Sequence, residues 1–283
     1  MLIEEIRIQV AGVELAAKQW GDSDKPAIIA LHGWLDNAAT YDLLAPCLSQ
    51  YRVIALDFAG HGHSSYRPSG MRYHVLDNVD DVIGLADALD LEQFVLIGHS
   101  MGAGIASYTA ASFPERVSKL IMIEGIGTVS SPAVEAPKIL RQSIEELKKA
   151  GAKRKPIYER KEEAIAARAQ SIGGISMEAS AMLCARGLEV IEGGFTWRSD
   201  PRLKMASSLR LTDELVNSFL AVLTMPVLVI RAEQSFVALS YTLQERAGRI
   251  ADCRLVSLPG NHHLHLEAAT YSAVAAAVQD FLA

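Results

Sequence analysis

The 283-residue chain has few cysteines and no long apolar run. Cys47, Cys184 and Cys253 are too few and too scattered for a disulfide framework or a metal cluster, which favours a reducing compartment. No apolar run approaches the length of a membrane span, and the acidic, alternating N-terminus lacks the apolar core of a signal peptide. These absences predict a soluble, cytoplasmic protein.

The chain also lacks an excess of positive charge. Its net charge of −6 gives no support to a nucleic-acid partner or to an anionic membrane surface. No dinucleotide or phosphate loop is present, and His262, His263 and His265 lack the spacing of a helical metal pair. The sequence therefore predicts no cofactor, no metal and a small-molecule substrate, and it leaves a homodimer open.

What the sequence does contain is an alternation of strands and helices, with enough hydrophobic residues (50%) for a sizeable core. A period-two pattern predicts an opening antiparallel hairpin over residues 3–10 and 13–20. Short apolar runs predict buried strands at 27–31, 52–58, 94–97, 117–123, 227–230 and 254–258. Helical patterns lie between them, at 37–50, 73–89, 103–113, 241–250 and 264–282. We therefore expect an α/β fold, a mostly parallel sheet with helices on both faces.

The pattern changes between residues 126 and 225. Helical segments predominate there, at 138–150, 157–170, 177–189 and 212–223, with an irregular or short extended piece at 193–201. Because strand–helix alternation resumes afterwards, this block predicts a helical cap inserted into a core formed by 1–125 and 226–283.

The chemistry is centred on Gly98-His99-Ser100-Met101-Gly102, which lies between a predicted strand and a predicted helix. A serine at such a turn, with glycine two residues away on each side, matches the Gly-x-Ser-x-Gly nucleophile elbow. The alternative is an ordinary turn in which the serine caps a helix. The flanking elements favour Ser100 as a nucleophile.

Four motifs in this order resemble the α/β-hydrolase superfamily. They are His32-Gly33-Trp34, Asp57-x-x-Gly60-x-Gly62-x-Ser64, Gly98-x-Ser100-x-Gly102 and Gly260-Asn-His262. Gly33-Trp-Leu-Asp-Asn37 and Phe195-x-Trp-x-x-Asp-Pro-Arg-Leu203 are similar to segments of the serine hydrolase-like proteins. The resemblance covers the predicted core, and the helical block matches a cap by position only.

A serine nucleophile needs a base, and the chain offers eight histidines. His32, His61, His63 and His99 lie in glycine-containing loops, where they are expected to brace the backbone, and His74 opens a helix and is expected to be solvated. The resemblance favours His262, five residues before Glu267, over His263 as the base. His265 is expected to cap or pack the final helix.

The acid that orients the base is missing from its usual place. The superfamily usually has an aspartate in the loop after the strand that follows the cap, where this chain has Ser235. Glu233 lies two residues earlier in that loop. Glu124 ends the strand after the elbow helix, where related haloalkane dehalogenases place a glutamate. Since an unpaired buried carboxylate is costly, Glu124 is favoured and Glu233 is the alternative.

The resemblance implies that backbone N–H groups of Trp34 and Met101 form the oxyanion hole, and that Asp57 braces a loop. The Trp34 indole either lines the substrate pocket or only packs. The sequence thus predicts a serine esterase with the catalytic group Ser100, His262 and Glu124. It acts through an acyl-enzyme on small to medium, partly apolar esters.

Serine at the elbow argues against alkyl halides and epoxides, whose related hydrolases have aspartate there. Thioesters, lactones and C–C bonds beside a ketone remain open as substrates. A non-catalytic, receptor-like protein on the same fold is the alternative from another class, and the missing aspartate favours it.

Overall fold

The computed structural model describes residues 2–150, 154–171 and 173–283. Its main sheet has the strand order β1-β2-β4-β3-β5-β6-β9-β10. The antiparallel part comprises β1 (Ile3–Val10), β2 (Val13–Trp20) and the junction of β2 with β4. The parallel part comprises β3 (Ala27–Leu31), β4 (Arg52–Asp57), β5 (Phe94–His99), β6 (Val117–Ile123), β9 (Val227–Ala232) and β10 (Cys253–Leu258). The predicted mostly parallel sheet is confirmed.

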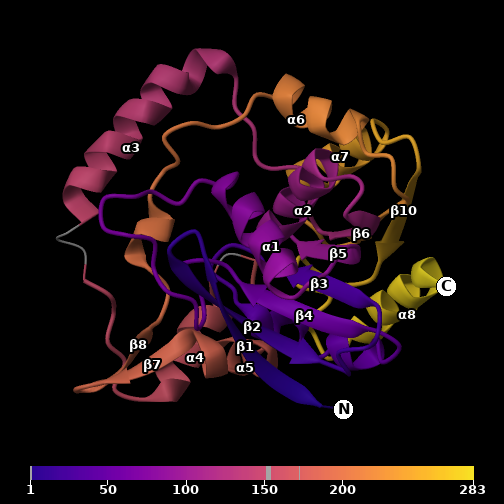
Figure 1. Cartoon of the computed structure of the whole chain (residues 1–283). Coiled ribbons are helices and arrows are strands. Elements are labelled where there is room, and N and C mark those ends of the chain that lie inside the picture. The colour runs from indigo at the N-terminus through magenta and orange to yellow at the C-terminus, as the bar shows by residue number, and fades with distance from the viewer. Residues whose placement is uncertain (1, 151–153, 172) are drawn as a thin grey trace.

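Helices cover both faces of this sheet (Figure 1). One apolar core lies under α1 (Asp77–Ala88), α2 (Met101–Ser112), α6 (Asp213–Ala221) and α7 (Val237–Ala247). A second core lies under α8 (Tyr271–Leu282) and two short 3₁₀ helices, η1 (Ala38–Tyr41) and η2 (Ala45–Cys47). The central strands β3 and β5 are buried along their whole length, which explains their unbroken apolar sequences.

Two predicted helices were wrong in extent. Residues 37–50 form only η1 and η2, because Pro46 lies within the first residues of η2 and the Asn37 side chain caps η1. The closing helix begins at Tyr271 rather than residue 264, because the chain makes tight turns through the histidine-rich segment before it. Leu264 N–H bonds the Asn261 carbonyl there.

The segment between β6 and β9 is mainly helical, as its sequence pattern predicts. It contains η3 (Ala133–Glu135), α3 (Ala136–Ala150), α4 (Lys161–Ala169), α5 (Met177–Gly187), η4 (Pro201–Lys204) and α6. The irregular or short extended piece predicted at 193–201 contains a short strand, β8 (Gly194–Trp197), paired with β7 (Leu188–Ile191). In Figure 1, α3 stands away from the sheet, whereas α5 is tied to β1 by the ion pair of Arg186 with Glu5. Residues 151–153 and 172 of this segment are outside the described part, and its treatment as a separate cap stays a prediction.

Among the described residues, no helix is both long and apolar enough to cross a membrane. The three cysteines are free: Cys184 is buried, and Cys47 and Cys253 are partly exposed. Cytoplasmic location and a homodimer stay predictions.

Candidate functional site

Ser100 lies at the turn between β5 and α2, in a backbone conformation that few L-residues adopt. Its φ is 52° and its ψ is −114°. Such a conformation is strained for a non-glycine residue, and it persists only where its surroundings enforce it. The Ser100 N–H bonds the Ile123 carbonyl at 2.9 Å, which ties the turn to the end of β6. The strand–turn–helix arrangement expected around this serine is present.

The glycines around Ser100 are required by close backbone contacts. A Cβ on Gly98 would lie 2.3 Å from the Gly102 carbonyl oxygen. A Cβ on Gly102 would lie 2.2 Å from the carbonyl oxygen of Leu31, at the end of β3. Neither position can carry a side chain without moving backbone, which explains the Gly-x-Ser-x-Gly spacing.

Ser100, His262 and Glu124 form a continuous hydrogen-bonded line. His262 Nε2 lies 3.0 Å from Ser100 Oγ, and His262 Nδ1 lies 3.1 Å from Glu124 Oε2. A carboxylate only accepts hydrogen bonds, so the imidazole donates from Nδ1 and its Nε2 is the acceptor for the serine hydroxyl. The three side chains follow β5, β6 and β10, and the two that lie farthest apart in sequence, Ser100 and His262, are separated by 162 residues.

Glu124 is almost completely buried, with 1% of its surface exposed, and its φ of 51° is also in the left-handed region. Two donors from the end of β9 hold its carboxylate. Ala232 N–H donates to Oε1 at 2.7 Å, and the Ser235 hydroxyl donates to Oε2 at 2.5 Å. Glu233, the alternative acid, is exposed, and within the described part of the chain its carboxylate has no partner, while its backbone N–H bonds the Leu258 carbonyl.

The loop that carries Trp34 is braced by histidine side chains. His32 accepts from Phe58 N–H at 3.1 Å, and His61 accepts from Leu35 N–H at 3.3 Å. Burial lowers the pKa of His32 to about 4 and that of His61 to about 3, so both rings are neutral acceptors at neutral pH. The predicted bracing roles of these two residues are confirmed.

Met101 directly follows Ser100, and Trp34 lines the same pocket as Met101. Met101 is the first residue of α2, and N–H groups in the first helical turn have no intrahelical acceptor. The Trp34 N–H bonds no acceptor in the described part of the chain. Both groups therefore remain available to an oxygen atom bound beside Ser100.

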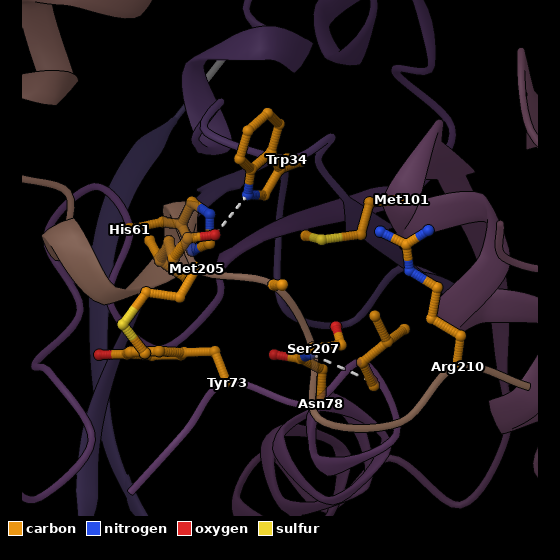
Figure 2. A pocket seen from close by; sticks show the side chains of 11 residues that line it. Trp34, His61, Tyr73, Asn78, Met101, Met205, Ser207 and Arg210 are labelled. Atoms are coloured by element: carbon orange, nitrogen blue, oxygen red, sulfur yellow. Dashed lines mark hydrogen bonds between the residues drawn. The ribbon is translucent and has the colours of Figure 1, made fainter. Parts of the chain in front are cut away.

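A pocket of about 190 Å³ lies beside this turn (Figure 2). Trp34, His61 and Met101 contribute its core wall. The remaining lining residues come from the approach to α1 and its first turn and from the stretch after η4: Tyr73, Val75, Asn78, Leu203, Met205, Ala206, Ser207 and Arg210. The pocket thus lies between the core and the inserted segment.

The segment around η4 belongs to the Phe195–Leu203 motif of the sequence, and its residues are hydrogen-bonded to the core. The Trp34 indole donates to the Leu203 carbonyl at 3.0 Å, and Tyr73 donates to Asp200 at 2.8 Å. Arg202 pairs with the same aspartate at 2.7 Å. The Asp-Pro-Arg-Leu sequence therefore closes one side of the pocket, and Trp34 both lines the pocket and anchors this stretch.

A second group of polar residues lies buried behind the site. Asp36 accepts from Arg168 of α4 at 2.6 Å and contacts His263 Nε2 at 3.3 Å. Burial alone would raise the pKa of Asp36, but His263 and Arg168 hold it well below its usual range. His99 Nε2 lies 2.8 Å from the His262 carbonyl, so His99 braces the segment that carries the base candidate.

Some assignments from sequence were wrong. His63 does not brace backbone, because its ring lies 3.8 Å from the Glu5 carboxylate. Of the two roles predicted for His265, capping is wrong, because its fully buried ring lies 2.8 Å from the Thr40 hydroxyl; packing against the final helix stays a prediction. The sequence reading also missed the Asp36 group, although Asp36 lies in the glycine-tryptophan motif that the sequence singled out.

The ligand atoms of Asp36, His99 and His263 lie within 4.8 Å of one another, a spacing compatible with a metal ion. However, the Arg168 guanidinium is bonded to the same aspartate and lies 3.5 Å from His263 Nε2. A fixed cation at this position opposes metal binding, so the group is better explained as a buried ion-pair network.

Comparison with known proteins gives consistent matches. The alpha/beta hydrolase fold family matches residues 26–147. A serine hydrolase-like protein of Dictyostelium discoideum is 34% identical, over 93% of this chain and 78% of the relative. A 2-(acetamidomethylene)succinate hydrolase of Mesorhizobium japonicum is 26% identical, over 91% of this chain and 87% of the relative. The crystal structure of a hypothetical protein from Pseudomonas aeruginosa superposes with a TM-score of 0.95, at 41% identity and 99% coverage of both chains.

Proposed function

Because this chain belongs to the α/β-hydrolase family, and within it to the serine hydrolase-like proteins, we propose that it is a serine carboxylesterase. In this proposal it cleaves small to medium, partly apolar esters through an acyl-enzyme. The observation that carries the proposal is the hydrogen-bonded line from Ser100 through His262 to Glu124.

In the first step, Ser100 Oγ attacks the ester carbonyl while its proton passes to His262 Nε2. A neutral hydroxyl is a weak nucleophile at pH 7, so this transfer is what makes the attack productive. Glu124 holds the imidazole in the Nδ1–H tautomer and stabilises the imidazolium that forms. Its two donors, Ala232 N–H and the Ser235 hydroxyl, keep the carboxylate in position.

The carbonyl oxygen becomes an oxyanion as the new bond forms. The N–H groups of Trp34 and Met101 are the proposed donors to it, because these residues line the same pocket and neither N–H has an acceptor among the described residues. Collapse of the tetrahedral intermediate then breaks the ester C–O bond, and His262 returns its proton to the leaving alcohol. A water molecule, activated by His262 in the same way, releases the acid.

The size of the pocket supports short acyl groups. Its volume is about 190 Å³, and a cavity of about 150 Å³ in another protein is large enough to hold benzene. An acyl chain of roughly six carbons is therefore the expected upper range.

A serine, histidine and carboxylate in this arrangement can also hydrolyse bonds other than esters. Thioesters, lactones and C–C bonds beside a ketone are alternative substrates, and the relative from Mesorhizobium is named for a succinate derivative. A receptor-like protein without catalysis is the alternative from another class. The serine–histidine–carboxylate line counts against it, because binding alone does not require that geometry.

The test is a series of p-nitrophenyl esters from acetate to decanoate, assayed with the wild type and with Ser100→Ala. We expect turnover to be highest at or below six carbons and to fall at least about 10³-fold in Ser100→Ala. A fluorophosphonate probe should label the wild type and not the variant. Absence of both turnover and labelling in the wild type would favour the receptor-like alternative.

The acid is tested by Glu124→Gln, with Glu233→Gln as its matched control. We expect kcat to fall about 10²–10⁴-fold in Glu124→Gln, because the glutamine cannot stabilise the imidazolium. Glu233→Gln should retain turnover within about twofold of the wild type, since its carboxylate is exposed. Near-normal turnover in Glu124→Gln would overturn the assignment.

A further inference from the structure

The pocket beside Ser100 contains one arginine whose role the proposed reaction does not use. Arg210 lies on the stretch between η4 and α6, and it lines the pocket together with Met101 and Ser207. In Figure 2 its guanidinium is turned toward the Met101 side of the pocket. The nucleophile is the residue immediately before Met101.

Arg210 is the only ionised side chain among the described residues that line this pocket. The lining includes no aspartate or glutamate. The rings of His61 and Tyr73 also line the pocket, and both are neutral, because burial lowers the pKa of His61 to about 3 and raises that of Tyr73. The local charge is therefore positive, although the chain as a whole carries a net charge of −6.

Arg210 also lacks a partner that would neutralise it. Its guanidinium makes no hydrogen bond or ion pair with any residue in the described part of the chain. The acid nearest in sequence, Asp213, is bonded instead to Arg246 at 2.8 Å and to the Ser130 hydroxyl at 2.7 Å. Arginines elsewhere around the site, such as Arg168 and Arg202, are paired with buried aspartates.

We propose that Arg210 binds a carboxylate at the far end of the acyl group, so that the preferred substrates are monoesters of short dicarboxylic acids. The inference rests on the proposed function and narrows its substrate class. A guanidinium presents parallel N–H donors that match a carboxylate. The Ser207 hydroxyl, which lines the same pocket and has no partner among the described residues, supplies a further donor.

The length of the substrate follows from the pocket. The pocket that Met101 and Arg210 line has a volume of about 190 Å³. In the proposal the reacting carbonyl lies at its Met101 end, next to Ser100, and the carboxylate lies beside Arg210. An adipoyl group has six carbons and falls within the size range that this volume allows. A long-chain fatty acyl group is too large for this pocket, and it has no negative charge to pair with Arg210.

The test compares p-nitrophenyl hydrogen adipate with p-nitrophenyl hexanoate, which has the same number of acyl carbons but no charge. In the wild type we expect kcat/KM to be at least about tenfold higher for the adipate ester. Arg210→Gln should abolish this preference, so that kcat/KM for the adipate ester falls to the level of the hexanoate ester. Arg210→Lys should keep part of the preference, because lysine retains the charge but not the fork of donors.

Arg254→Gln is the matched control, because it removes an exposed positive charge from β10, far along the sheet from the pocket. Its preference for adipate should equal that of the wild type. An unchanged adipate preference in Arg210→Gln, or no preference in the wild type, would overturn the inference while leaving the esterase proposal intact.

Binding of free adipate, measured by calorimetry, separates this inference from the reaction. Weaker binding to Arg210→Gln by about tenfold or more would support the carboxylate site even if no ester were turned over. Equal binding to the wild type and to Arg210→Gln, or no binding to either, would count against it. Loss of all Ser100-dependent turnover with adipate binding intact would reject the esterase proposal alone.

Discussion

Ser235 occupies the position where the superfamily usually has its acid, and its hydroxyl lies 2.5 Å from the Glu124 carboxylate. Side chains from the ends of two neighbouring strands, β6 and β9, therefore reach the same point beside His262. A carboxylate supplied from either strand end should be able to orient the imidazole. This geometry gives a physical reason for the displacement of the acid.

Relocating the acid tests this reading. In a Glu124→Gln background, Ser235→Asp should restore kcat at least about tenfold, because the new carboxylate lies within reach of His262 Nδ1. Ser235→Ala alone should lower kcat by only about tenfold or less, since the Ala232 N–H still holds the carboxylate. Steady-state kinetics on one p-nitrophenyl ester measures both effects. No recovery in a folded double variant would contradict the shared position.

Among individual site residues, the sequence predicted those that belong to a short local motif. Ser100 and its glycines follow from a turn of five residues, and Glu124 follows from the cost of ending a buried strand with an unpaired carboxylate. The Asp36 group could not be predicted in the same way. Its members come from separate loops and from α4, and only the folded chain brings Arg168 within 2.6 Å of Asp36.

Among the elements, α4 has a direct ionic connection to the core. The side chains of Arg168 and Asp36 are 12% and 2% exposed. Removing one partner of a buried pair leaves the other charge without compensation, which typically costs about 3–5 kcal/mol. The pair also fixes α4 against the loop that contains Trp34.

We therefore expect Arg168→Met to lower the free energy of unfolding by about 2–4 kcal/mol. Urea denaturation followed by circular dichroism measures this change. The double variant Asp36→Asn/Arg168→Met should recover part of the loss, because the buried charge is then absent.

Arg160→Met is the control for this element. Arg160 pairs with Glu163 at 2.9 Å at the start of α4, but its side chain is 72% exposed. We expect its effect to stay within about 0.5 kcal/mol, as is typical of solvated pairs. Equal effects of Arg168→Met and Arg160→Met would show that the buried link does not hold α4.

Element types were predicted well wherever hydrophobic periodicity was strong. The hairpin at 3–20 and the buried strands follow from burial on one or two faces. The pairing of β7 with β8 was missed because each strand has only four residues and depends on contacts with its partner. Helix ends were displaced where turns, such as those before α8, compete with helical propensity.

Across the whole molecule, several histidines are buried in the neutral form. Burial lowers the pKa of His32 to about 4 and lowers those of His61 and His265 to about 3. The unfolded chain binds these protons near pH 6.5, whereas the folded chain does not. Their contribution to stability is therefore complete above about pH 6.5 and is lost as the pH falls toward 4.

We expect the free energy of unfolding to decrease between pH 6.5 and 5 by up to about 2 kcal/mol for each of these histidines. Asp81 offsets a minor part of this loss, because burial raises its pKa to about 6 and its protonation favours the folded state. Urea denaturation at constant ionic strength over pH 5–8 measures the slope.

His265→Gln provides the comparison for this pH dependence. The variant removes one buried titrating ring while keeping a polar group near Thr40, so its stability should fall less steeply below pH 6.5 than that of the wild type. A wild-type stability that is flat, or that rises, from pH 6.5 to 5 would contradict the neutral state of these histidines.

The contacts of Glu124 also decide at what stage of synthesis the proposed catalytic group can assemble. Its N–H bonds the Ile230 carbonyl and its carboxylate is held by Ala232 and Ser235, so its position depends on residues more than 100 places later in the chain. His262 follows later still. In the proposed mechanism, Ser100 therefore emerges during synthesis long before the groups that would activate it, and we expect a nascent chain to be inactive until its last strands join the sheet.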